Sequence, residues 1–328
     1  MRIAFVLGLI MGVVLSSPSS AENDDGILLE TRNFVLARNY RTLERLSSQY
    51  RDSKEKTADG LWKLERFYAA FDQPEYLYGT SPAEAVEELQ SFTGFWLMAY
   101  PDSPAAHIID AMVLLRKGWN ARGGGTSETV TRDGWRVFRE NVRLAGEKLE
   151  AYPAGAKDPQ WHAMMIQQAI AADASGEGFR KVMDAALAQE PSYGWTISNI
   201  VKRFLPQWGG NKVILDEVVR YIVSHNVEAD RPAIYTRAYW SVAFQLVGGS
   251  NPFKRESADW SMMKAGFEQI TEEYPTRHNS MAFASFACLA DDLQTAKRII
   301  EKLAPLKVDD GVIGASLARC SLRYAEPK

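Results

Sequence analysis

The chain has 328 residues, a formal net charge of −3 at pH 7 and a hydrophobic content of 46%. This length suits two ordinary domains or one elongated array, and the hydrophobic content is normal for a chain with a full core. The near-neutral charge gives no reason to expect nucleic-acid binding, which requires a strongly basic face.

The first 21 residues have the layout of a cleaved secretory signal. A positive start (1–2) precedes an apolar run (3–15) and a stretch of small residues (16–21). The apolar run is shorter than the roughly 20 residues that cross a bilayer, so a permanent anchor is the weaker alternative. We therefore expect cleavage after Ala21 and a periplasmic or secreted protein. No later stretch is apolar enough to span, so no membrane insertion is expected after cleavage.

Proline follows a capping residue at the start of three apolar stretches, at Ser81-Pro82, Ser103-Pro104 and Asp158-Pro159. A Ser or Asp side chain accepts hydrogen bonds from the free N–H groups of a first helical turn, and proline fits that turn because it needs no partner there. This pattern predicts an array of helices.

The predicted helices follow one another through short connections. In chain order they span 27–38, 40–56, 58–71, 81–100, 104–121, 133–152, 159–175, 179–189, 212–224, 232–247, 257–274, 279–290, 293–303 and 311–324. A strand competes with the helix only at 212–224, where β-branched residues are frequent. Short connections imply antiparallel neighbours, so we predict an all-α fold of antiparallel helical hairpins with about fifteen helices.

The spacing of prolines adds a repeat signal. Pro159 and Pro191 are 32 residues apart, close to the 34 of a tetratricopeptide unit, and Ala186 occupies a small-residue position of that repeat. Gln167 and Phe179 fall where small residues belong, so the expectation is a tetratricopeptide-like α-solenoid. Residues 22–328 are predicted to form one helical-repeat domain, with a subdivision near 209–210 as the alternative.

Cys288 and Cys320 are the two cysteines of the chain. In an exported protein an even pair predicts a disulfide, which would join the last predicted helix to the array. Two buried free thiols are the alternative.

The chain contains a set of short motifs in a characteristic order. The segments are RNYRTLERLSSQYR with LWKLERFY, WNARGGG, DPQWHAMM, EPSY, LPQWGG, YTRAYW, DW, and YPTRHN followed by FACLADD. In this order the chain resembles the uncharacterised bacterial family named domain of unknown function 4034, over nearly all of the mature sequence. The resemblance implies a helical, tetratricopeptide-like architecture and supplies no activity or catalytic residue.

The most conspicuous loop is Gly123-Gly124-Gly125, which follows Trp119 and Arg122. Its backbone N–H groups could hold an anion, with Arg122 facing the ligand. A phosphate-binding P-loop, however, needs a strand before it and a Lys-Ser/Thr pair after it, and both are missing. A helix C-cap is therefore the competing interpretation.

Three further residues are candidates for a ligand or partner surface. Trp208 lies between a proline and two glycines at a predicted helix end, whereas the other tryptophans either fill gaps between helices or form platforms for a ligand. Arg277 and His278 share a polar loop that could face a ligand, or Asn279 could cap the following helix there.

Catalytic signals are missing from the sequence. No two of the four histidines have zinc-ligand spacing, and neither His-Glu-x-x-His nor Gly-x-Ser-x-Gly occurs. We expect no catalytic, metal-binding or cofactor-binding residues and no cofactor. The leading hypothesis is a noncatalytic scaffold for an unidentified protein or peptide. The alternatives are a glycan or small-ligand binder that uses Trp and Arg near the glycine loop, and an enzyme with an unrecognised site.

Overall fold

The computed structural model describes residues 25–205, 210–243, 251–255, 258–303 and 320. These residues form helices and no strand, apart from one isolated bridge between Lys56 and Trp62. The all-α prediction is therefore confirmed.

The helices follow the predicted order closely. In the first half of the chain they are α1 (Asp25–Leu36), α2 (Tyr40–Ser53), α3 (Lys63–Asp72), α4 (Pro74–Tyr78), α5 (Pro82–Ala99), α6 (Pro104–Arg122), α7 (Arg132–Ala151) and α8 (Pro159–Ala171). In the second half they are α9 (Gly176–Gln189), α10 (Gly194–Arg203), α11 (Lys212–Ser224), α12 (Arg231–Val242), α13 (Pro252–Arg255), α14 (Trp260–Glu273), α15 (Arg277–Leu289) and α16 (Leu293–Ile300).

The predicted caps explain where these helices begin. The Ser81 hydroxyl accepts from the N–H of Glu84, whose side chain returns the bond to Ser81 in a capping box. The hydroxyl of Ser103 and the carboxylate of Asp158 accept from backbone N–H groups at 3.1 Å and 2.9 Å. At α11, Asn211 accepts from two N–H groups of the first turn. The β-branched residues there thus form a helix, because a local cap and an apolar stripe both favour it.

One predicted helix began too early, and three helices were not expected. The predicted helix 58–71 begins only at Lys63, because residues 54–62 form a loop with left-handed backbone at Lys54 (φ 54°) and Gly60 (φ 80°). The helices that were not expected are α4, α10 and α13, and α10 contributes Arg203 to the groove described below. The predicted helix 311–324 lies outside the described residues except for Cys320.

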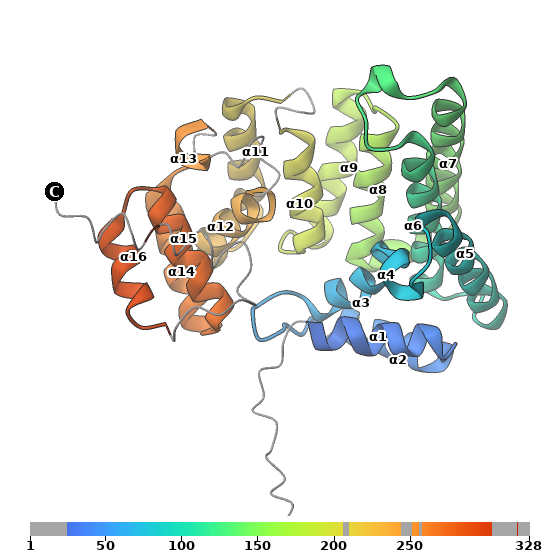
Figure 1. Cartoon of the computed structure of the whole chain (residues 1–328), viewed down its shortest axis with the longest axis horizontal. Coiled ribbons are helices and arrows are strands. Elements are labelled where there is room, and N and C mark those ends of the chain that lie inside the picture. Colours follow the sequence, from blue (N-terminus) through green and yellow to red (C-terminus); the bar gives the residue numbers. More distant parts are fainter. Residues whose placement is uncertain (1–24, 206–209, 244–250, 256–257, 304–319, 321–328) are drawn as a thin grey trace, which may run out of the picture.

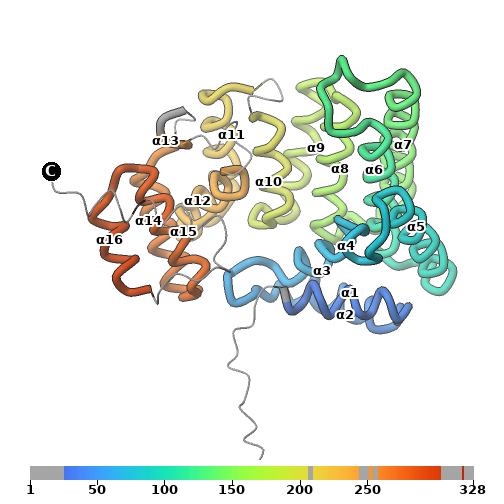
Figure 2. Tube along the Cα trace, in the orientation of Figure 1, coloured from blue at the N-terminus to red at the C-terminus, as the bar shows by residue number. Residues whose placement is uncertain are grey.

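Sequential helices pack against each other to form a curved array, as the pairs α5–α6, α6–α7, α8–α9, α12–α14 and α15–α16 show (Figure 1). The trace then bends back on itself. The loop between α2 and α3 contacts α12 and α15, so an early and a late part of the array lie side by side (Figure 2).

The hydrophobic core has two main clusters that meet at α8. Tyr68 and Trp96 are fully buried in the first cluster, and Tyr239 and Phe267 in the second. On α8 itself, Met164 belongs to the first cluster and Ile166 to the second. Burial of such large side chains is the main source of stability, because each short helix would be marginal alone.

The predicted disulfide is confirmed. Cys288 and Cys320 are bonded, with their Cα atoms 6.0 Å apart, and both are buried. Among the described helices, none combines the length and apolar character needed to cross a membrane.

Candidate functional site

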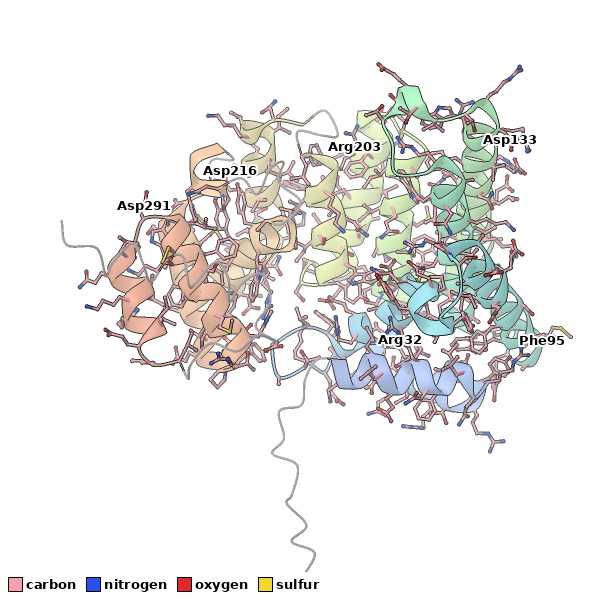
Figure 3. The ribbon with its side chains drawn as sticks, viewed as in Figure 1. Arg32, Phe95, Asp133, Arg203, Asp216 and Asp291 are labelled. Atoms are coloured by element: carbon pink, nitrogen blue, oxygen red, sulfur yellow. A yellow bond between two sulfur atoms is a disulfide. The ribbon has the colours of Figure 1, made fainter. Side chains whose placement is uncertain are left out.

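A groove of about 600 Å³ lies between α6, α7, α8 and the end of α10. It is lined by Trp119, Arg122, Trp135, Phe138, Arg139, Val142, Arg143, Gln168, Ile170, Ala171, Ala172, Asp173 and Arg203. We call it the Arg–Trp groove. Figure 3 shows Arg203 of α10 at the same edge of the molecule as Asp133 of α7, which is the edge where the groove lies.

Packing fixes the indole rings of the groove. Trp119 and Trp135 both meet the ring of Phe138 edge-on, with centroids 4.8 Å and 5.7 Å away. Phe138 is buried, whereas both tryptophans are half-buried. The two indoles are thus held by the core on one side and partly exposed on the other, as expected of rigid contact surfaces for a ligand.

Two arginines lie over these rings. The guanidinium carbon of Arg122 is 5.2 Å from the centre of Trp135 and 5.4 Å from that of Trp119. That of Arg139 is 5.5 Å from the centre of Trp135. Within the described part of the chain, neither Arg122 nor Arg139 pairs with a carboxylate. Their positive charges are therefore held in place by aromatic faces without being neutralised.

The glycine loop positions one of these arginines. Gly123 caps α6, with its N–H donating to the carbonyl of Trp119 at 2.9 Å, so the loop is a helix C-cap. The Arg122 guanidinium donates to the carbonyls of Gly123 and Gly125 at 2.9 Å and 3.0 Å. Carbonyl oxygens attract cations, so the loop orients Arg122 and is not itself an anion cradle. Gly124 has no neighbour close to the position of a Cβ atom.

The groove has an excess of positive charge. Four arginines line it against one carboxylate, that of Asp173. Arg143 is neutralised by Glu140 and Glu147 on the same helix, and the Arg143–Glu140 distance is 2.8 Å. The remaining excess comes mainly from the arginines that stack on the indoles. Such a field attracts carboxylates, phosphates or sulfates.

A second cavity of about 800 Å³ continues along α7. It is lined by Arg132, Asp133, Arg136, Arg139, Glu140 and Arg143. Because Arg139 and Arg143 line both cavities, the two adjoin. Arginines at 132, 136, 139 and 143 are three or four residues apart and therefore share one face of α7. The whole surface is elongated, which suits an extended ligand.

The structure separates the residues that the sequence analysis grouped as candidates. Trp119 and Arg122 line the Arg–Trp groove, whereas His278 lines another cavity next to Trp240. The predicted loop at Arg277 and His278 was wrong, because these residues are the first two of α15. Trp208 lies outside the described residues.

The predicted cap of α15 was wrong. The capping side chain is that of Thr276, which accepts from the N–H of Asn279 at 3.2 Å. The Asn279 side chain is buried and donates to the carbonyls of Tyr274 and Asp59. A threonine three residues before the expected site competes for the same role, and the asparagine is needed elsewhere.

Sequence reasoning missed Arg139 and Arg203 as parts of the groove, and it did not single out Trp135 among the tryptophans that could form ligand platforms. The available signal was the arginine spacing along α7, which marks one helix face. Nothing in the local sequence shows that Arg203 of α10 faces that surface, since this depends on how α8 and α10 pack.

The described residues contain no group of three or more His, Cys, Asp and Glu side chains that could hold a metal ion. His107 stacks on Tyr152 at 3.9 Å between ring centres, and His225 contacts Tyr221 on its own helix. Burial lowers the pKa of His162, which favours its neutral form. The four histidines thus lie in separate places.

Together these features define a helical array with a basic, aromatic groove on its surface. Comparison of the chain with models of protein families, with curated proteins and with solved structures found no match. The resemblance to the domain of unknown function 4034 family therefore stays a prediction from the sequence motifs.

Proposed function

We propose that this protein is an exported, noncatalytic scaffold whose Arg–Trp groove binds an acidic peptide segment of a partner protein. The observation that carries the proposal is the position of Arg122 and Arg139. Both are held over Trp135 without a carboxylate partner among the described residues. Arginine and tryptophan are the residues that most often dominate binding energy at protein interfaces.

The shape of the surface favours a peptide over a compact ligand. The groove adjoins the cavity along α7, and the arginines of that helix continue beyond the indoles. An extended chain with acidic side chains could pair with successive arginines while an aromatic or aliphatic side chain contacts Trp119 or Trp135. Guanidinium groups bind carboxylates through two parallel hydrogen bonds, which also fixes the register of the peptide.

Fluorescence anisotropy with a labelled twelve-residue peptide rich in Asp and Glu tests this function. We expect measurable binding that weakens with added salt, because salt screens the attraction between the exposed arginines and the acidic side chains of the peptide. The variant with Arg122→Ala and Arg139→Ala should bind at least about tenfold more weakly, equivalent to about 1.4 kcal/mol. Unchanged binding by this variant would contradict the proposal.

Arg180→Ala is the matched control. Arg180 also lies over an aromatic ring, that of Tyr221 at 4.4 Å, but it is outside the groove and paired with Asp184. Removal of Arg180 should leave peptide affinity unchanged.

A second candidate function, binding of an anionic glycan or small ligand in the same groove, is favoured by the half-buried rings of Trp119 and Trp135. Titration with sulfated or carboxylated oligosaccharides, followed by tryptophan fluorescence, separates the two. Quenching by these compounds in the absence of peptide binding would favour the glycan ligand.

Export to the periplasm or beyond is part of the proposal. It is supported by the disulfide, which forms and persists in oxidising compartments. Cell fractionation and N-terminal sequencing test it, and we expect the mature chain to begin at Glu22.

A further inference from the structure

The arginines along α7 differ in their partners. Arg136 pairs with Asp133 at 2.7 Å, close to the start of the helix, where Figure 3 labels Asp133. Arg143 is paired as well. By contrast, Arg132 and Arg139 are exposed and have no carboxylate partner among the residues that the structure describes. The helix face therefore presents unpaired positive charge at two positions, with neutralised arginines after each of them.

Helix geometry sets the distance between these two positions. Arg132 and Arg139 are separated by close to two helical turns, so both lie on one face of α7. Each residue adds about 1.5 Å along the axis, which places their Cα atoms about 10.5 Å apart in that direction. Arg122 strengthens the second position, because it lies over the same Trp135 ring as Arg139. A peptide that pairs with both positions must carry carboxylates at a similar spacing.

This spacing distinguishes between peptide conformations. A β-strand presents every second side chain on one face, at about 6.7 Å or about 13.4 Å, and neither value matches the two arginine positions. A polyproline II helix has three residues per turn and presents every third side chain on one face, at about 9.3 Å. An α-helix matches too, with carboxylates two turns apart, because it repeats the geometry of α7.

The indoles of the groove favour the polyproline II helix over the α-helix. The Trp135 N–H has no hydrogen-bond acceptor within the described part of the chain. A polyproline II helix has no internal hydrogen bonds, so its carbonyls are free to accept from this donor, whereas those inside an α-helix are already bonded. Trp119 and Trp135 are also half-buried and held against Phe138. Grooves lined by such aromatic side chains bind proline-rich segments.

The paired positions of α7 disfavour a continuous run of acids. Asp133 and Glu140 line the same cavity as Arg132 and Arg139. A peptide with an acid at every position would bring carboxylates next to these two, where the arginines are already neutralised. Such acids would lose water without gaining a partner. A peptide with uncharged residues between its acids avoids this cost.

We propose, on the basis of the peptide-binding function above, that the acidic segment is a polyproline II helix with a carboxylate at every third residue and prolines between. One carboxylate would pair with Arg132, and the next with Arg139 and Arg122. A proline ring would pack on an indole of the groove. The Trp135 N–H would donate to a peptide carbonyl.

Three labelled peptides of equal length and charge test the proposal by fluorescence anisotropy. The first repeats Glu-Pro-Pro. The second has the same composition, with all its glutamates together at one end. The third repeats Glu-Gly-Gly. We expect the first to bind at least about fivefold more tightly than either of the others, because it alone combines the spacing with a conformation that is fixed before binding.

The Asp- and Glu-rich peptide described above is measured beside these three. If no peptide binds, the peptide-binding function and the polyproline ligand are both wrong. If the Asp- and Glu-rich peptide binds while the Glu-Pro-Pro repeat has no advantage over the clustered or the glycine peptide, only the polyproline ligand is wrong.

Variants of α7 locate the contacts. Arg132→Gln should remove the advantage of the Glu-Pro-Pro repeat over the clustered peptide, because one of the two unpaired positions is lost. The control is Asp133→Asn combined with Arg136→Gln, which removes an ion pair from the same helix without changing the net charge and should keep the advantage. All three residues are exposed, so both variants should fold. An advantage that survives in Arg132→Gln would overturn the proposal.

Discussion

The carboxylate of Glu65 accepts a hydrogen bond of 2.5 Å from the backbone N–H of Gly194, which lies 129 residues later in the chain. Gly194 is the first residue of α10, so the carboxylate lies at the positive end of that helix. Glu65 is only 5% exposed, and its burial raises its pKa to about 7. This contact anchors α3, near the start of the array, to α10 in its middle.

Gly194→Ala should destabilise the fold, because a Cβ atom there would lie 2.8 Å and 2.9 Å from the two carboxylate oxygens of Glu65. Glu65 is buried and cannot move away freely, so we expect a loss on the order of 1–3 kcal/mol in urea unfolding. Gly176→Ala is the control at the first residue of α9, where nothing lies within 4 Å of the added atom. Equal stability of the two variants would contradict this account of Gly194.

Glu65→Gln should remove a pH dependence of stability. In the folded protein the pKa of Glu65 is about 7, above its ordinary value of 4.5. The stabilisation of the fold by protonated Glu65 is therefore fully present below about pH 4.5 and is lost as the pH rises through 7. Burial raises this pKa, whereas Lys56, Arg237 and the N–H groups of Gly194 and Trp195 lower it.

Native protein should therefore lose up to about 3 kcal/mol between pH 4.5 and pH 7 relative to Glu65→Gln, since each pKa unit corresponds to about 1.4 kcal/mol. Gln keeps the carbonyl that accepts from Gly194. Unfolding in urea across this pH range measures the difference, and parallel pH profiles for the two proteins would show that Glu65 is not its source.

Thr276→Ala should cost more stability than Thr131→Ala. Both hydroxyls cap a helix, accepting from Asn279 at 3.2 Å and from Gly134 at 3.0 Å. Loss of such a cap costs about 1 kcal/mol. Thr276 also donates to the carboxylate of Asp59 in the loop of residues 54–62, which adds about 1 kcal/mol to the cost of the substitution.

Hydrogen exchange distinguishes these two effects of Thr276. Amide exchange in residues 54–62 should accelerate in Thr276→Ala and stay unchanged in Thr131→Ala, because only the first substitution releases the loop. Equal exchange in both variants would refute a role of Thr276 in holding this loop.

Replacement of Cys288 and Cys320 by alanine should lower the free energy of unfolding by roughly 3–4 kcal/mol, because the bridge closes a loop of 32 residues in the unfolded chain. Calorimetry with and without reductant provides the measurement. The reductant should lower the melting temperature of the native chain and leave that of the double variant unchanged. A lower melting temperature in both proteins would show that the reductant acts through something other than the disulfide.

The helix starts were predictable because their causes are local. Ser81, Ser103 and Asp158 act on N–H groups two or three residues away, so a short window of sequence contains both the cap and the helix that it begins. The loop of residues 54–62 was not predictable in this way. Trp62 at its end fits the apolar helical pattern of α3, which extended the predicted helix into the loop. The conformation of the loop is supported by distant partners such as Arg237 and Asn279.

The candidate site was predictable only in part. Trp119, Arg122 and the glycine loop are adjacent in sequence, and the structure does place Trp119 and Arg122 in one groove. Arg203 reaches the same groove through the packing of α10 against α8. The periodicity of the sequence does not predict which helices pack against each other. The sequence by itself therefore determined the all-α class and the caps, because hydrogen bonds within a helical turn depend on near neighbours. Only the tertiary structure decided the Arg–Trp groove and the contacts of the loop of residues 54–62 with α12 and α15, because both bring together residues that are far apart along the chain.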